Sequence, residues 1–159
     1  MQKKSFTLSE ARQKLEYYCS YQERCHNEVA EKLKRLNMSS EETDEIIVHL
    51  IQHNFLNEER FASSFSRGKH TIKHWGKVRI ANELKFRNIS KYNIDKALKE
   101  IPQEVYLQHF HALAEKHWET IRETDPVKKK KKCCDFLLRK GFESNLVFEK
   151  LKDLENGNR

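Results

Sequence analysis

The chain has 159 residues, which is enough for one ordinary domain or a short array of small ones. Charged residues make up 35% of it and hydrophobic residues 37%, a thin apolar supply for a compact sphere with a large core. The 31 Lys and Arg residues outnumber the 24 Asp and Glu residues, and the net charge of +7 favours contact with nucleic acid or an acidic protein surface. No apolar run approaches the ~20 residues of a membrane span and the N-terminus lacks the apolar core of a signal peptide, so we expect no membrane partner and a cytoplasmic protein.

The four cysteines do not have the spacing of a zinc site. Cys19, Cys25, Cys133 and Cys134 form no CxxC pair, and a bond between the neighbouring Cys133 and Cys134 would close a strained ring. Cys19 and Cys134 fall on apolar stripes, where a free cysteine behaves as a small buried hydrophobe. We therefore expect no structural metal at these residues.

The chain also lacks the residue constellations of an enzyme. It has no glycine loop that could hold a phosphate, no nucleophile elbow and no HExxH motif. His49 with His53, and His70 with His74, have the four-residue spacing that can hold a metal on a helix, but neither pair has a third ligand nearby. We expect no catalytic activity, no cofactor and no small-molecule substrate.

Apolar residues recur at helical spacing along the chain, and only four Gly and two Pro interrupt them, so we expect an all-α protein. Thr7 with Glu10, and Ser39 with Glu42, have the spacing of a capping box before the first and the third helix. The expected helices cover 8–21, 26–36, 40–53, Asn57 to Gly76, 77–87, Ser90 to Ile101, Pro102 to Ile121, Asp125-Pro126 to Gly141, and a last one carrying Leu146 to Leu154.

The stretch in the middle of the chain has the greatest density of basic and aromatic side chains. Asn57 can cap a helix there, and the acidic Glu58 and Glu59 suit the positive end of the helix dipole. The expected buried stripe consists of Phe61, Phe65 and Ile72, with the small Ala62 and Gly68 between them. The opposite side is expected to carry Arg60, Arg67, His70 and His74, with Lys69 and Lys73 beside them. We expect Arg60 to make a structural ion pair or to join helices.

The nine expected helices fall into three similar groups of three. A shift of 51 residues maps Ala30, Leu33, Asn37, Met38, Ile47 and Leu50 onto Ala81, Leu84, Asn88, Ile89, Leu98 and Ile101. A further shift of 53 residues leads to Cys134, Leu137, Gly141, Phe142, Leu151 and Leu154. Such a period indicates a tandem array, because each unit is too small to bury its own stripe and must pack on its neighbours. We expect an elongated, curved array of three-helix repeats at residues 1–56, 57–102 and 103–159.

Three runs of the sequence carry a resemblance to a known family: Leu56 to Ala62, residues 76–89, and Leu137 to Phe142. They resemble the RecX family of bacterial recombination regulators, and the resemblance covers about residues 8–155. The first run is similar to the family's run of a leucine, an acidic pair, an arginine, an aromatic residue and an alanine, the second to its glycine-led second helix, and the third to its third-repeat turn. The chain has Lys77 where the family often has proline and Asn88 where it often has glycine; both residues tolerate the required backbone.

The resemblance implies a non-enzymatic modulator of the RecA recombinase, usually an inhibitor, that acts in recombination and DNA repair. Members of the family are expected to lie along the groove of the RecA filament on single-stranded DNA and to contact adjacent protomers. A bent rod with a basic surface is physically suited to that task. The resemblance therefore names the RecA filament as partner, with weak electrostatic contact to single-stranded DNA beside it.

The candidate binding site is the basic cluster of the middle repeat, and part of a lysine run extends it. Its residues are Arg67, Lys69, His70, Lys73, His74, Trp75, Lys77, Arg79, Lys85 and Arg87, together with Lys128, Lys129 and Lys132. Such a surface can neutralise phosphates or pair with carboxylates. The alternative is a solvated helix surface in which Glu83 pairs with Arg79 or Arg87. We expect Trp75 to anchor the packing between repeats, and Lys131 to fall near the apolar side and extend outward.

Two other classes of protein fit the sequence. The first is an autonomous DNA-binding protein, in which a two-helix unit enters a DNA groove as helix-turn-helix proteins do. Its candidate recognition helix, at about 90–100, carries Asp95 and Glu100 against Lys91, Lys96 and Lys99, which is poor for reading bases. The second is a helical scaffold for another acidic partner.

Overall fold

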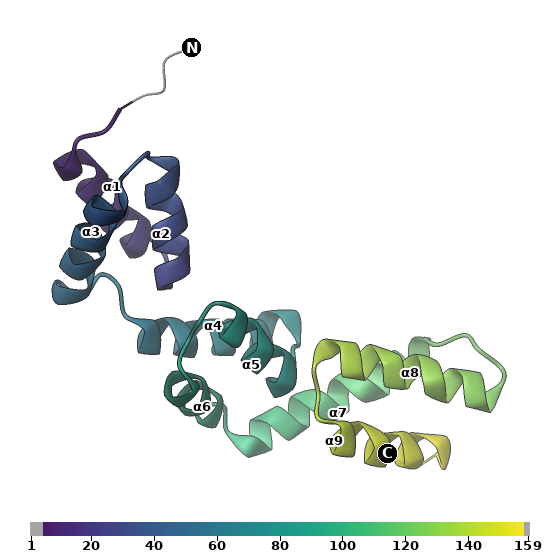
Figure 1. The fold of residues 1–159 in the computed structure, drawn as a ribbon. Helices are drawn as coiled ribbons and strands as arrows, with labels where there is room; N and C mark the ends of the chain where they lie inside the picture. The colour runs from purple at the N-terminus through teal and green to yellow at the C-terminus, as the bar shows by residue number, and fades with distance from the viewer. Residues whose placement is uncertain (1–4, 158–159) are drawn as a thin grey trace.

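A computed structural model describes residues 5–157 of the chain. Over this range the chain forms nine α-helices and no strand, which confirms the expected all-α class (Figure 1). The helices are α1 (Leu8–Tyr21), α2 (His26–Arg35), α3 (Ser40–Gln52), α4 (Glu58–Lys73), α5 (Lys77–Phe86), α6 (Lys91–Lys99), α7 (Gln103–Thr120), α8 (Pro126–Lys140) and α9 (Ser144–Glu155).

The helices form three consecutive groups, and the array bends between the first group and the other two (Figure 1). The second helix of each group, namely α2, α5 and α8, lies toward the inside of the bend. We call this side the inner face. The elongated and curved shape agrees with the expectation from the thin apolar supply.

Most helix starts follow the capping chemistry that the sequence indicates. Thr7 accepts from the backbone N–H of Glu10, and Glu10 accepts from that of Thr7, so a complete capping box begins α1. Asn57 accepts from the N–H of Arg60 at the start of α4. Pro102 differs slightly from expectation, because it is the residue before the first turn of α7 rather than part of that turn.

The middle of the chain turns earlier than expected. Helix α4 ends at Lys73, and His74 rather than Gly76 adopts the left-handed conformation, with φ of 60°. Gly76 instead precedes the first turn of α5. Asn37, Asn88 and Gly141, which the repeat shifts place at one position, all adopt the left-handed conformation in which helices commonly end, with φ of 61°, 60° and 97°.

Each group has its own hydrophobic cluster, built from equivalent positions. These positions are fully buried: Val29, Ile80 and Cys133, then Leu33, Leu84 and Leu137. The clusters are linked at their edges, since Cys25 of the first group belongs to the middle cluster and Ile101 of the second group to the last.

Two expected core residues, Ile72 and Cys134, are placed differently, and so is Val78, an apolar residue at helical spacing in the helix expected at 77–87. Ile72 is 71% exposed, because α4 buries Phe61, Ala62, Ser66 and His70 instead. Val78 is exposed, and the neighbouring Ile80 takes the core position in α5. Cys134 is only partly buried and Cys133 is the core cysteine, whereas Cys19 is buried as expected. In each case the true stripe runs one or two residues away from the expected one.

Candidate partner-binding surface

The start of α5 is held by the third group of helices. The backbone N–H of Gly76 donates to the carbonyl of Lys140 at 2.8 Å, and that of Val78 to the carbonyl of Gly141 at 3.0 Å. The N–H of Lys77 donates to the Tyr106 hydroxyl at 2.9 Å, and this hydroxyl donates to the Glu143 carboxylate. The free N–H groups of one helix start are thus satisfied by a neighbouring repeat. This junction fixes α5 beside α8 on the inner face.

Trp75 lies next to this junction and carries two cations on its ring. The guanidinium of Arg79 is 4.1 Å from the ring centroid, and the ammonium of Lys69 is 5.0 Å from it. Trp75 also meets Phe65 edge-on and packs against the middle hydrophobic cluster. It was expected to anchor the packing between repeats, but these ring contacts are with residues of the middle repeat itself, where it positions two of the candidate basic residues.

Two of the nearby cations share the ring of Phe65. The guanidinium of Arg87 is 4.8 Å and the ammonium of Lys69 is 5.4 Å from its centroid. Arg87 also pairs with Glu83 at 3.1 Å, the helix pair that the sequence indicated. Lys69 lies against the two rings and is in no ion pair with a described carboxylate, so its charge remains available to a partner, whereas the charge of Arg87 is partly balanced by Glu83.

His70 is not a surface residue, contrary to expectation. Its side chain is 3% exposed, since it faces the third group of helices rather than solvent. Its Nδ1 donates to the Trp75 carbonyl at 2.9 Å, so the Nε2 of the neutral ring accepts from His109 Nδ1 at 2.9 Å. Burial lowers the pKa of His70, and the neutral form fits this network.

Among the other expected residues of the middle repeat, some basic side chains are exposed and outside any ion pair with a described residue, and one contacts an aromatic ring. Arg67, Lys73 and Lys85 are exposed, and none of them is in an ion pair with another described residue. His74 is exposed at the end of α4. Lys77 is engaged at the junction, with its ammonium 4.6 Å from the centroid of the Tyr106 ring.

The lysine run lies at the start of α8 and is spread around the helix. Lys130 pairs with Glu155, and Lys132 with Glu123, at 3.0 and 3.3 Å. Lys131 is exposed and pairs with Asp135, so it does not lie near the apolar side as expected. The remaining two residues of the run are Lys128, which is exposed, and Lys129, whose ammonium is 4.3 Å from the Trp118 ring centroid. The run therefore makes no continuous basic stripe with the middle repeat.

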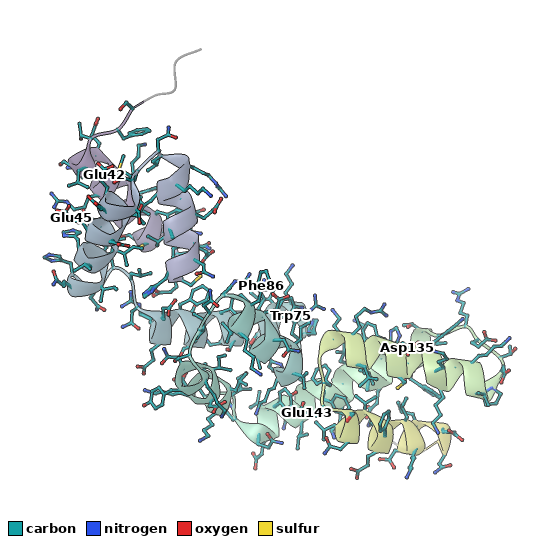
Figure 2. All side chains as sticks on the ribbon, in the orientation of Figure 1. Glu42, Glu45, Trp75, Phe86, Asp135 and Glu143 are labelled. Carbon is teal, nitrogen blue, oxygen red and sulfur yellow. The ribbon has the colours of Figure 1, made fainter. Side chains whose placement is uncertain are left out.

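The inner face contains two hollows, one on each side of Phe86. The first lies between α2 and α5 and the second between α5 and α8, with volumes of about 320 and 390 Å³. Cations outnumber carboxylates among their lining residues, and the cations are Lys32, Arg35, Arg79, Arg87 and Arg139. Phe86 is 82% exposed and stands at the inside of the bend (Figure 2). An exposed aromatic between two basic hollows is a typical anchor for a protein partner.

Sequence reasoning missed Phe86, Arg35 and Arg139 as surface residues. The repeat shifts could have found them, because 51 residues separate Arg35 from Phe86 and 53 separate Phe86 from Arg139. The three residues thus occupy one position of the repeat, near the end of α2, α5 and α8. This position faces outward in every group, since all three side chains are exposed.

The charge of the array differs from one side to the other. Glu42 and Glu45 of α3 lie on the side of the first group away from the bend (Figure 2). In α6, the candidate recognition helix, Lys91 pairs with Asp95 and Lys96 pairs with Glu59. Free positive charge is therefore more available on the inner face than on these two helices.

Neither a metal cluster nor a membrane-spanning helix is found in the described part of the chain. No group of three or more His, Cys, Asp or Glu side chains is arranged to hold a metal among residues 5–157. Over the same residues, no helix has both the length and the apolar character needed to cross a bilayer.

The fold places the chain in the class of all-α proteins built from tandem three-helix repeats. Models of the RecX family match two parts of the chain: the second three-helix domain matches residues 57–98 and the third matches residues 104–151. The crystal structure of RecX from Lactobacillus salivarius superposes with a TM-score of 0.79 and 26% identity, covering 93% of this chain and 96% of that one. The chain belongs to the RecX family of regulatory proteins.

Sequence relatives agree with this assignment. The regulatory protein RecX of Bacillus cytotoxicus is 27% identical over 138 residues, which are 87% of this chain and 51% of the relative. That of Limosilactobacillus reuteri is 29% identical over 136 residues, or 86% of this chain and 51% of the relative. The chain thus spans about half the length of the curated relatives it matches. A second crystal structure of a regulatory protein RecX, at 24% identity and a TM-score of 0.77, shares the fold.

Proposed function

We propose that this chain is a non-enzymatic regulator of the RecA recombinase and acts mainly as an inhibitor. Its inner face lies along the groove of the RecA filament on single-stranded DNA, and the middle repeat makes the main contact. Membership of the RecX family supports RecA as the partner. The shape supports the mode of binding, because a bent array can follow a surface longer than itself.

One observation carries the proposal: the inner face has two neighbouring hollows lined by arginine, and helices of all three repeats contribute to them. Phe86 separates these hollows and is 82% exposed, although an exposed phenylalanine adds little to the stability of the fold. Aromatic and arginine side chains dominate the binding energy of protein interfaces, and they act best when a partner removes them from water. We therefore assign Phe86 as the apolar anchor and the arginines around it as its charged rim.

The proposal is tested by the inhibition of RecA's DNA-dependent ATP hydrolysis. Reversing charge with Arg35→Glu and Arg139→Glu together should raise the concentration needed for half inhibition by about tenfold or more, because like charges would then face the partner. Phe86→Ala should weaken inhibition with no loss of helix content in circular dichroism. These positions suit the test better than Lys77 or Arg79, which hold the junction with the third group.

A matched control has the same change in charge elsewhere. Lys99→Glu with Lys152→Glu alters two exposed cations, on α6 and α9, that are in no ion pair with a described residue. This control should inhibit RecA as the unchanged chain does. Equal weakening by both double variants would show that net charge and not the inner face is responsible. Full inhibition by the Arg35 and Arg139 variant would remove this surface from the mechanism.

A further inference from the structure

A separate groove of about 680 Å³ runs between α1 and α2 in the first group of helices. Tyr17, Tyr18 and Tyr21 line it, together with three basic residues. Tyr17 and Tyr21 are each 72% exposed, and their ring centroids are 6.4 Å apart. The groove thus presents two aromatic rings, one helical turn apart, to solvent.

The fold itself does not require these tyrosines. Helix α1 packs through Ala11, Leu15 and Cys19, which lie on its other side and are buried in the first hydrophobic cluster. Tyr17 and Tyr21 add no buried area to that cluster, because most of each side chain remains in water. Two adjacent exposed rings at such a position are available for a planar ligand.

The basic residues of the groove are held in place and keep their charge. The Arg24 guanidinium stacks 3.7 Å from the centroid of the Tyr18 ring, and its Nε donates to the Tyr18 carbonyl at 3.0 Å. The Lys32 ammonium is 5.5 Å from the same centroid, and that of Lys14 is 5.0 Å from the Phe6 ring. None of these three cations is in an ion pair with a described carboxylate. Glu10 is the one carboxylate among the described residues that line the groove, so the groove combines flat aromatic surface with an excess of positive charge.

We propose that this groove binds single-stranded nucleic acid, with bases stacked on Tyr17 and Tyr21 and phosphates beside Lys14, Arg24 and Lys32. Grooves that bind single strands combine these features, since every base has a flat face and every phosphate a negative charge. An amphipathic acidic helix fits less well, because it needs a continuous aliphatic surface. Leu36 is the single aliphatic side chain among the described residues that line the groove.

The site is tested by fluorescence anisotropy with a labelled oligothymidylate of about 12 nucleotides, a length within the usual site size. Replacing both rings with Tyr17→Ala and Tyr21→Ala should weaken binding by about tenfold or more, because each stacked base is lost. Tyr17→Phe with Tyr21→Phe keeps the rings and should bind as the unchanged chain does. Tyr92→Ala, at a 70% exposed residue of α6, is the control for loss of an exposed ring and should also leave binding unchanged.

An abasic oligonucleotide of the same length separates stacking from charge. The unchanged chain should bind it more weakly than oligothymidylate, whereas the double alanine variant should bind both equally. Equal binding of both ligands by the unchanged chain would overturn the proposal, as would full binding by the double alanine variant. A third outcome would also overturn it: a glutamate-rich peptide binds in the groove, and the tyrosine substitutions weaken the binding of this peptide but not that of the oligonucleotide. The groove would then be a protein-binding site. RecA is absent from these measurements, so their outcome is independent of the proposed inhibition.

Discussion

Gly76 lies directly against Gly141, and the contact leaves no room for a side chain on either residue. A Cβ atom on Gly76 would be 2.3 Å from the Gly141 carbonyl oxygen, and one on Gly141 would be 2.2 Å from the Cβ of Arg79. Both glycines are buried, and Gly141 also has a positive φ. The start of α5 and the end of α8 can therefore meet backbone to backbone, which fixes the second repeat against the third.

The first prediction concerns this contact. Gly76→Ala should lower the free energy of unfolding by about 3 kcal/mol, because its methyl group must displace backbone atoms rather than a flexible side chain. Urea denaturation measures the change. Gly68→Ala is the matched control, because a Cβ at this α4 position meets nothing within 4 Å. It should stabilise the protein by roughly 0.5–1 kcal/mol through its helix propensity. If Gly76→Ala were as stable as Gly68→Ala, the close contact would be contradicted.

The second prediction concerns pH. Burial lowers the pKa of His70, so the unfolded chain takes up a proton on this residue at a higher pH than the folded chain does. The free energy of unfolding should therefore fall as the pH drops below about 6.5, the ordinary histidine value, toward the folded pKa. Urea denaturation at pH 8.0 and 5.5 measures the fall. His70→Gln should be less stable at pH 8.0 but lose less between the two values, and an unchanged pH dependence would rule out His70 as its source.

The third prediction concerns a charged residue in the core of the last repeat. Lys150 is 6% exposed and its ammonium lies 2.6 Å from the Glu115 carboxylate. The repeat shifts place it where the other groups have Ala97 and Ile46, both buried. Lys150→Met should therefore keep the protein as stable or stabilise it by about 1 kcal/mol, because methionine fills the site without a charge to desolvate. Glu115→Ala should destabilise it by about 1 kcal/mol, since Lys150 then loses its partner. Thermal denaturation of both variants tests this, and a larger loss for Lys150→Met than for Glu115→Ala would refute it.

The fourth prediction concerns the link between the first two groups. Arg60 of α4 donates from Nε to Glu23 at 2.5 Å and from its terminal nitrogens to Asn54, at the end of α3. Arg60→Lys should lower the free energy of unfolding by about 1–2 kcal/mol, because lysine cannot make this set of directed bonds. A double-mutant cycle with Glu23→Gln measures the coupling in urea denaturation. A coupling energy near zero would show that the pair does not join the groups.

The class of fold and most helix ends could be predicted because they depend on local chemistry. The capping box of Thr7 with Glu10 is a property of a few neighbouring residues. The tandem organisation was visible because equivalent core positions recur at a fixed shift. Arg60 was expected to pair or to join helices, and its partner proved to be Glu23, which lies 37 residues away. A partner at that distance cannot be read from local spacing.

The candidate site was harder to predict because exposure depends on the packing between repeats. His70 has the spacing of a surface residue on α4, yet the third group covers it and His109 bonds to it. Phe86 looks like a core residue by type, yet it is exposed because Leu84 fills the core position of α5. The error at His70 and the omission of Phe86 both arise at surfaces between repeats, whose geometry the apolar stripes alone do not define.

The most direct test of the account is a photo-crosslink from the inner face to RecA. Benzoylphenylalanine replaces Phe86 in one variant and Tyr92, on α6, in another; the two residues are 82% and 70% exposed. Each variant is irradiated with RecA filaments assembled on single-stranded DNA. Binding through the inner face predicts a crosslink to RecA from position 86 and none from position 92. A crosslink from position 92 alone, or from neither position while the protein still inhibits RecA, would contradict it.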